Sequence, residues 1–172
     1  MSKKPQKIIT IVHTGFGDSG NTKVGGKVIS KTNPLVKFMG LLDSCQALTV
    51  CGEIQNYIFV LGALANNPSN KDYQKKLEEY YEYISYKSKE LIENLPPLTG
   101  FIRTNPGNQS LMQLRAKIRE AELAYCEYIE SIGEENVIFN LQPFLNLLSD
   151  YIFSFIWYWD VERKELTVWE GI

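Results

Sequence analysis

The sequence has little of what disulfide frameworks and zinc sites need. Among its 172 residues there is one histidine, His13, and there are three cysteines, Cys45, Cys51 and Cys126. An odd number of cysteines without a CxxC spacing argues against structural disulfides and against a zinc site, and it favours a reducing compartment. We therefore expect a cytoplasmic protein in which all three cysteines are small buried hydrophobic residues.

The sequence also lacks an excess of positive charge and a long apolar run. The 18 Lys and Arg residues are balanced by 20 Asp and Glu residues, which gives a formal net charge of −2. The surplus of cations with which a general nucleic-acid binder neutralises phosphates is therefore missing. No stretch reaches the ~20 uninterrupted apolar residues of a membrane span. We expect a soluble protein that binds neither nucleic acid nor membrane and keeps its N-terminus.

What the sequence does contain is helical periodicity. Hydrophobic residues make up 44% of the chain and recur at steps of three and four after residue 33, which predicts amphipathic helices. The expected helical segments are 34–66, 72–95, 109–132 and 143–159. The first is either one long helix or two helices that break near Gly52; Pro96 ends the second, and Gly133 is the expected C-cap of the third. The predicted fold class is all-α, a four- or five-helix bundle in one domain over residues 1–172.

Glycine is concentrated near the N-terminus. Five of the 12 glycines lie between residues 15 and 26, so we expect residues 1–33 to be a flexible leader, residues 34–159 the helical bundle, and residues 160–172 a tail. Within that tail, 161–169 is either a short strand or an ordered extension. The helix 143–159 is apolar nearly all the way round, so it is either central in the bundle or covered by a neighbouring subunit, and we favour an oligomer.

The leader is the first candidate binding site. Glycines, hydroxyls and a following lysine suit a phosphate chain, because backbone N–H groups can turn toward one point and the lysine adds positive charge. The alternative is a merely flexible, turn-rich leader. Neither the P-loop motif nor the GxGxxG motif is present. The residues of this candidate site are Thr14, Gly17, Asp18, Ser19, Gly20, Thr22 and Lys31.

A second candidate lies on the predicted helix 109–132. Arg115, Arg119 and Glu122 are spaced by four and three, so they form one stripe at the margin of the apolar face. The alternative is an intrahelical ladder of salt bridges. Asp43, Asn146 and Asp150 are also polar residues within apolar helical faces, and a buried carboxylate needs a cationic partner or several donors.

Weaker candidates remain. His13 is either a general base or, as we favour, a structural residue. The five tyrosines of segment 72–95 could stack on bases, but the neighbouring glutamates cancel the positive charge of the lysines, so core and surface roles are favoured. These tyrosines are Tyr73, Tyr80, Tyr81, Tyr83 and Tyr86.

Several motifs, taken in order, resemble the ATP:cob(I)alamin adenosyltransferases of the propanediol-utilisation type. The family's phosphate loop is similar to Thr14–Thr22, TGFGDSGNT, and its Gly-Gly…Ser-Lys element to Gly25–Lys31, GGKVISK. Its aspartate after Tyr-Gly-x-x matches Asp43, and its Gln-x-x-Leu-Phe-x-Leu-Gly element is similar to Gln55–Gly62, QNYIFVLG.

The resemblance continues to about residue 157. The family's Pro-Leu-x-x-Phe-Ile element is matched by Pro97–Ile102, PLTGFI. Its arginine-rich signature is similar to Leu114–Leu123, LRAKIREAEL, and its Asn-x-x-Ser-Asp-Tyr element to Leu145–Phe153, LNLLSDYIF.

This resemblance implies a homotrimer with sites between subunits, in which Asp43 pairs with Arg115 across the boundary. It implies that the leader residues named above bind MgATP together with Arg119, Glu122 and Asn146, with Mg²⁺ held by ATP and by Glu122 rather than by the protein alone. The resemblance also implies that Phe101 lies against the corrin and helps to exclude its lower axial ligand. Asp43, Arg115 and Phe101 are thus the implied catalytic residues, and a corrinoid reductase or an adenosylcobalamin-dependent enzyme are candidate partners.

The implied reaction transfers the 5′-deoxyadenosyl group of ATP to the cobalt of reduced cobalamin or another corrinoid and releases triphosphate. The alternative is a non-catalytic member that binds ATP or a corrinoid as a carrier or regulator. Two missing arginines favour this alternative, since Glu120 replaces one and Leu147 the other, and Phe16 also replaces a threonine of the phosphate loop. The joint retention of the other site residues disfavours it; these are Asp18, Asp43, Arg115, Arg119, Glu122 and Asn146.

Overall fold

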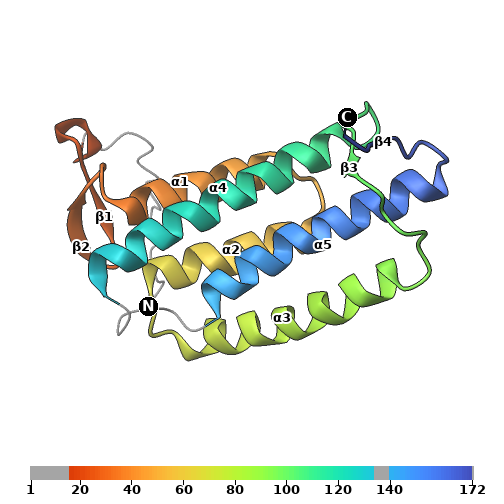
Figure 1. Ribbon diagram of the computed structural model, residues 1–172. Coiled ribbons are helices and arrows are strands. Elements are labelled where there is room, and N and C mark those ends of the chain that lie inside the picture. Colours follow the sequence, from red (N-terminus) through yellow and green to blue (C-terminus); the bar gives the residue numbers. More distant parts are fainter. Residues whose placement is uncertain (1–15, 134–139, 172) are drawn as a thin grey trace, which may run out of the picture.

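The computed structural model describes residues 16–133 and 140–171 and shows a bundle of helices (Figure 1). Five α-helices occur in these ranges: α1 (Pro34–Ala47), α2 (Gly52–Asn66), α3 (Lys71–Ile92), α4 (Gln109–Ile132) and α5 (Leu141–Glu162). The all-α prediction is confirmed. The first predicted segment is two helices, with the break just before Gly52, and α5 runs three residues beyond the expected end at Trp159.

The helix ends follow from local side chains. The Asn33 Oδ1 atom accepts a hydrogen bond from the Leu35 amide at 2.9 Å, with Pro34 in the first turn, as is usual at a capped N-terminus. At the C-terminal end of α4, Gly133 has φ 80°, and its amide donates to the Ile129 carbonyl at 3.0 Å. Gly133 is therefore the C-cap that the sequence predicts.

The helices form a closed ring around one core. Neighbouring pairs are α1 with α4, α4 with α5, α5 with α3, α3 with α2, and α2 with α1. Aromatic rings fill the centre: Phe38 packs on Tyr125 with centroids 5.1 Å apart, and Tyr57 meets Phe144 edge-on at 5.8 Å. All four rings are almost completely buried.

Helix α5 lies between α3 and α4 (Figure 1), and its residues Phe144, Leu148 and Ile152 are buried within the chain. Its aromatic side chains Tyr151, Phe153 and Phe155 stay only half-buried. None of the helices in the described ranges has a stretch both long and apolar enough to cross a membrane.

Part of the leader has regular structure that the sequence analysis does not predict. A 3₁₀ turn η1 (Phe16–Ser19) precedes an antiparallel hairpin of β1 (Asn21–Val24) and β2 (Lys27–Ser30). Gly25 and Gly26 form its turn with φ values of 55° and 81°, which side chains disfavour. The Gly25 amide donates to Asn66 Oδ1 at 2.8 Å and so docks the hairpin on the end of α2. At Gly25 and Gly26, glycine therefore forms a tight turn rather than the flexible leader that we expected.

A second, smaller ribbon lies at the opposite end of the bundle (Figure 1). Strand β3 (Phe101–Ile102) pairs antiparallel with β4 (Val168–Trp169), in the register Phe101 with Trp169 and Ile102 with Val168. Of the two options for segment 161–169, the short strand is therefore the correct one for its last two residues.

Candidate functional site

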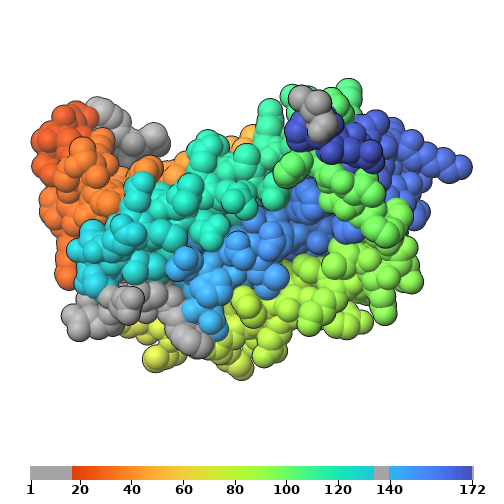
Figure 2. All heavy atoms as spheres, viewed as in Figure 1, coloured from red at the N-terminus to blue at the C-terminus, as the bar shows by residue number. Residues whose placement is uncertain are grey.

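The stripe on α4 faces a matching stripe on α5. Arg115, Arg119 and Glu122 share one face of α4, and Asn146, Asp150 and Phe153, spaced by four and three, share one face of α5. Figure 2 shows the two helices side by side on one face of the molecule. The Arg115 guanidinium carbon lies 4.8 Å from the centroid of the Phe153 ring. The structure thus brings the α4 residues to the α5 residues, as a common binding site requires.

Electrostatic effects link these side chains. Burial lowers the pKa of Arg115, the nearby positive charge of Arg119 lowers it further, and Asp150 opposes both effects. Burial raises the pKa of Glu122, Arg119 opposes that shift, and Asp150 adds to it. Arg119 and Asp150 thus act on both groups, so the charges of the two helices form one electrostatic cluster.

The stripe is not a ladder of salt bridges. Within the described part of the chain, no carboxylate lies within 4.0 Å of the Arg115 or Arg119 guanidinium. The Arg115 Nε atom is buried and has no hydrogen-bond partner there. A desolvated donor without an acceptor is unfavourable, so this stripe is suited to an anion supplied from outside the chain.

Asp43 lies elsewhere. It is exposed in a groove of about 220 Å³ between α1 and α2, beside the exposed ring of Phe59, and so lies on a different face from Arg115, which belongs to the α4–α5 face. The expectation that Asp43, Asn146 and Asp150 are buried in apolar faces is wrong for the single chain, where all three are exposed. The physical reason is that these helix faces have no further element of the described chain packed over them.

The predicted phosphate-binding residues of the hairpin region lie together. A Cβ atom added at Gly17 would be 2.9 Å from Lys31 Nζ, so the ammonium group lies directly over the Gly17 backbone. The Lys31 amide donates to the Gly20 carbonyl at 2.9 Å. Asp18, Ser19 and Gly20 are exposed, and Thr22 is half-buried. Thr14 and His13 lie outside the described residues.

Phe101 is at the opposite end of the bundle from the hairpin (Figure 1). Its side chain is 74% exposed, and its ring lies 6.1 Å from that of Trp169. The two ends are separated by most of the length of α5, whose 22 residues span about 33 Å at the helical rise. One chain therefore does not bring the leader and Phe101 to the same point.

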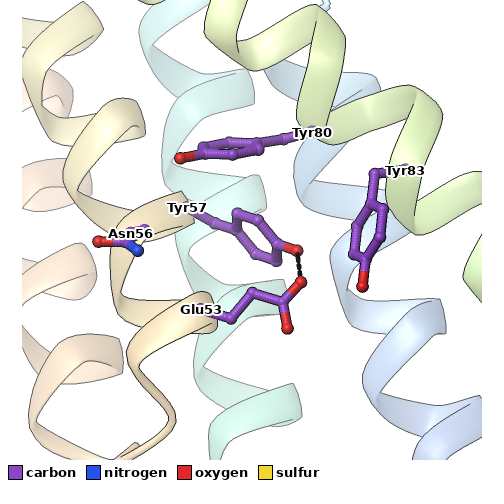
Figure 3. A pocket seen from close by; sticks show the side chains of 5 residues that line it. All are labelled: Glu53, Asn56, Tyr57, Tyr80 and Tyr83. Carbon is purple, nitrogen blue, oxygen red and sulfur yellow. Dashed lines mark hydrogen bonds between the residues drawn. The ribbon is translucent and has the colours of Figure 1, made fainter.

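Three tyrosines, Tyr57, Tyr80 and Tyr83, line a cleft that is separate from the α4–α5 stripe. A cavity of about 320 Å³ lies between α2 and α3 and is lined by Glu53, Asn56, Tyr57, Tyr80 and Tyr83 (Figure 3). The Tyr57 hydroxyl donates to Glu53 Oε1 at 2.6 Å, and burial, followed by this bond to a carboxylate, raises the pKa of Tyr57. None of the described residues that line this cleft is a cation, so it lacks the positive charge that favours a polyphosphate.

The cysteine expectation needs one correction. Cys45 is buried, Cys126 is half-buried, and Cys51 is exposed. Burial raises the pKa of Cys45 to about 12, which keeps its thiol protonated and unreactive. Cys51 is exposed because it is the N-cap of α2, in the short connection at the end of the bundle. Within the described ranges, no group of three His, Cys, Asp or Glu side chains could hold a metal ion.

Two polar residues near Phe101 escape the sequence analysis. Asn108 and Asp160 are each only 2% exposed, and the Asn108 Nδ2 atom donates to Asp160 Oδ2 at 2.7 Å. Asp160 directly follows a run of aromatic residues at the end of α5. A carboxylate at that position is the sequence signal that could have identified it, since a charge among apolar residues needs a partner.

The sequence profile of the family described as cobalamin adenosyltransferase matches residues 12–159. No curated protein sequence matches the chain.

Similar solved structures include variants of a PduO-type ATP:corrinoid adenosyltransferase from Lactobacillus reuteri. A phenylalanine-to-histidine variant complexed with cobalamin and ATP has a TM-score of 0.79 and 20% identity, covering 94% of this chain and 97% of that one. A phenylalanine-to-alanine variant with the same ligands has a TM-score of 0.78 and 19% identity, covering 94% and 100%. An arginine-to-lysine variant complexed with ATP has a TM-score of 0.77 and 20% identity, covering 92% and 99%. At this identity the likeness shows the fold.

Proposed function

The chain belongs to the cobalamin adenosyltransferase family, and we propose that it transfers the 5′-deoxyadenosyl group of ATP to the cobalt of a reduced corrinoid. The single observation that carries this proposal is the α4–α5 stripe, where Arg115 and Arg119 lie without a carboxylate within 4.0 Å in the described chain. Two cations without an ion-pair partner beside a half-buried glutamate suit a polyphosphate with its Mg²⁺.

The reaction balances without a protein nucleophile. The electron pair on Co(I) attacks C5′ of the ribose, the Co–C bond forms, the C5′–O bond breaks, and its electron pair leaves with the triphosphate. The protein has to hold the leaving group, orient C5′ toward cobalt and keep competing ligands away from the metal. A corrinoid reductase would supply the substrate, and an adenosylcobalamin-dependent enzyme would use the product.

The residues divide among these tasks. The Gly17–Gly20 backbone, Thr14, Thr22, Lys31 and Arg119 would bind the triphosphate, because amide N–H groups, hydroxyls and cations all donate to phosphate oxygens. Asn146 and Glu122 would orient the ribose. Mg²⁺ would be bound chiefly by the triphosphate, joined by the Glu122 carboxylate, since the described residues offer no cluster that holds a metal by itself. Phe101 would lie against the corrin and exclude its lower axial ligand.

A complete site requires more than one chain. Arg115 has an unsatisfied buried donor on the α4–α5 face, and Asp43 is an exposed carboxylate on the α1–α2 face. In a closed ring of identical subunits, these two faces of neighbouring chains can meet, so that Asp43 of one chain pairs with Arg115 of the next. The proposal therefore includes a homotrimer with intersubunit sites.

The alternative, a non-catalytic carrier or regulator, rests on the substituted positions Phe16, Glu120 and Leu147. The position of Glu120 weakens that alternative. Its carboxylate pairs with Lys117 at 2.6 Å, and both charges act on the Cys45 thiol of α1. The added negative charge thus lies on the α1 side of α4, away from the Arg115–Arg119 stripe.

An anaerobic assay separates the two functions. The purified protein is incubated with chemically reduced cobalamin and MgATP in the dark, and the light-sensitive Co–C product is followed by its absorption. A transferase forms this product and releases one triphosphate per Co–C bond. Binding of ATP or corrinoid by calorimetry without any product would assign the chain to the carrier class.

A further inference from the structure

The small ribbon that carries Phe101 is held in place by a buried polar network that joins the turn after β3 to the end of α5. From the geometry we infer that Asn108 and Asp160 are positioning residues, which fix Phe101 at the end of the bundle. The inference rests on the proposed function, in which the Phe101 ring lies against the corrin. It concerns two side chains that would not touch either substrate themselves.

The ribbon cannot hold its own position. Strands β3 and β4 contain two residues each, and a two-stranded ribbon of any length is marginal in water without packing. The Phe101 side chain is 74% exposed and contacts chiefly Trp169 of the paired strand. Ile102, 9% exposed, packs in the core. The direction of the Phe101 ring therefore depends on how the backbone on either side is fixed.

The Asp160 side chain fixes the turn that follows β3. Its Oδ2 atom accepts from Asn108 Nδ2 at 2.7 Å and from Asn105 Nδ2 at 3.4 Å. Asn108 Nδ2 also donates to the Arg103 carbonyl at 3.2 Å, while Asn108 Oδ1 accepts from the Asn105 amide at 2.9 Å. Asn108 thus ties both ends of the 103–108 turn to the last turn of α5.

The Asp160 backbone fixes the other strand. Its carbonyl accepts from the amides of Glu165 at 2.8 Å and Leu166 at 3.0 Å, which turns the chain back toward β4. The Arg103 amide then donates to the Thr167 carbonyl at 2.8 Å, which closes the ribbon. Asp160 is therefore the common anchor of both strands, through its side chain for β3 and through its carbonyl for β4.

Burial makes this network specific. Asn108 and Asp160 are both 2% exposed, and a buried carboxylate is held only where donors reach it. Loss of the Asn108 amide would remove the 2.7 Å donor and free the turn, so the ribbon would move while the bundle beneath it stays packed. The expected consequence is a misplaced Phe101 ring in a folded protein.

The test combines Asn108→Ala with Phe101→Ala. Because a displacement of about 1 Å at a reacting centre can cost up to 100-fold in rate, Asn108→Ala is expected to lower kcat about 10- to 100-fold, with the KM for ATP unchanged. If Asn108 acts through Phe101, the same change made in Phe101→Ala will lower kcat by less than about twofold. Thr104→Ala is the control, since Thr104 is an exposed residue of the same turn with no side-chain hydrogen bond among the described residues.

A second pair of variants guards against simple misfolding. Asn108→Asp places two carboxylates together and should be as defective as Asn108→Ala. Adding Asp160→Asn restores the bond between positions 108 and 160 with its direction reversed, but not the bond to the Arg103 carbonyl, so part of the lost activity should return. A swap that fails to recover kcat, or an Asn108→Ala loss of equal size with and without Phe101, would overturn the inference.

Hydrogen exchange gives a readout that does not depend on activity. The Arg103 amide, which closes the ribbon, should exchange faster in Asn108→Ala than in the wild type, while amides in the middle of α4 keep their protection. Unchanged exchange at Arg103 would overturn the inference even if the wild type were inactive. A wild type without transferase activity, but with faster Arg103 exchange in the variant, would instead count against the proposed function alone.

Discussion

The guanidinium of Arg115 is half-buried, and a buried guanidinium normally has a carboxylate beside it. This guanidinium lies against Phe153, its Nε atom has no partner within the described chain, and both burial and Arg119 lower its pKa. The spacing of Arg115, Arg119 and Glu122 predicts that they share one face, because helical geometry alone decides it. The exposure of Asp43 could not be predicted, because it depends on which faces other elements cover.

Glu122 provides a test of charge burial at one residue. Burial raises its pKa above the ordinary 4.5, so in the window between the two values the folded chain keeps a proton that the unfolded chain has lost. Stability due to this group therefore falls as the pH rises through that window. Glu122→Gln should have a higher melting temperature than the wild type at neutral pH and an equal one at about pH 3.5.

The matched control for that change is Glu120→Gln on the same helix. Glu120 is exposed and paired with Lys117, so its loss should not stabilise the protein at any pH. Isothermal calorimetry should show weaker MgATP binding for Glu122→Gln alone. An equal melting temperature of wild type and Glu122→Gln across the pH range would show that the Glu122 carboxylate is not desolvated.

Lys31 tests the phosphate-binding role of the hairpin region. Its ammonium lies over the Gly17 backbone, where it would meet a phosphate held by the amides of residues 17–20. Lys31→Ala should weaken ATP binding more than corrinoid binding, and Lys27→Ala, at the exposed start of β2, should weaken neither. Equal losses of ATP affinity in the two variants would mean that only general positive charge matters.

At the scale of the elements, the helices could be predicted and the strands could not. Segment 109–132 has an uninterrupted three- and four-residue repeat closed by a glycine, and α4 has those same bounds. The hairpin is too short to show a period, and its turn glycines look the same in sequence as glycines of a flexible loop. The ribbon of β3 and β4 joins residues far apart in the chain, which no local pattern reveals.

Gly25 tests how the hairpin is attached. Its φ of 55° disfavours a side chain, and an added Cβ would lie 2.7 Å from the Asn66 carbonyl oxygen, so Gly25→Ala both strains the turn and displaces the contact with α2. Gly26→Ala strains the turn alone, since its Cβ would meet nothing within 4 Å. A left-handed alanine costs roughly 1–2 kcal/mol, and Gly25→Ala should cost about 1 kcal/mol more.

Urea unfolding of the two glycine variants measures this difference through the shift of the midpoint. Gly25→Ala should also weaken ATP binding, because the loop before the hairpin would lose its anchor on α2. If Gly26→Ala destabilised the protein as much as Gly25→Ala, the contact with Asn66 would contribute nothing to docking.

At the scale of the whole molecule, the predicted site residues lie at four places in one chain, three of which are the hairpin, the α4–α5 stripe and the ribbon with Phe101. Asp43 occupies a fourth, on the α1–α2 face. The motifs that carry the family resemblance identify these residues, but their distribution over the surface depends on tertiary packing. This distribution favours a site formed between neighbouring subunits.

Charge pairing between subunits gives a further prediction. In the proposed trimer, Asp43 and Arg115 would form a buried pair, and removing one partner of such a pair leaves the other charge uncompensated, which typically costs ~3–5 kcal/mol. Asp43→Asn and Arg115→Gln should each lower trimer stability, and the two changes in one chain should recover assembly without recovering transfer. Sedimentation equilibrium measures assembly, and additive losses in the double variant would mean that the two residues do not interact.

The most direct measurement of the central claim is complementation between the two single variants. Asp43→Asn and Arg115→Gln chains are co-expressed with different tags, and the mixed trimers are purified and assayed for transfer. If each site takes Asp43 from one chain and Arg115 from its neighbour, every mixed trimer has both wild-type residues at one of its three sites, and activity returns to about one third of the wild-type value. If both residues of a site came from the same chain, every site would lack one of them, and the mixed trimers would be as inactive as either parent.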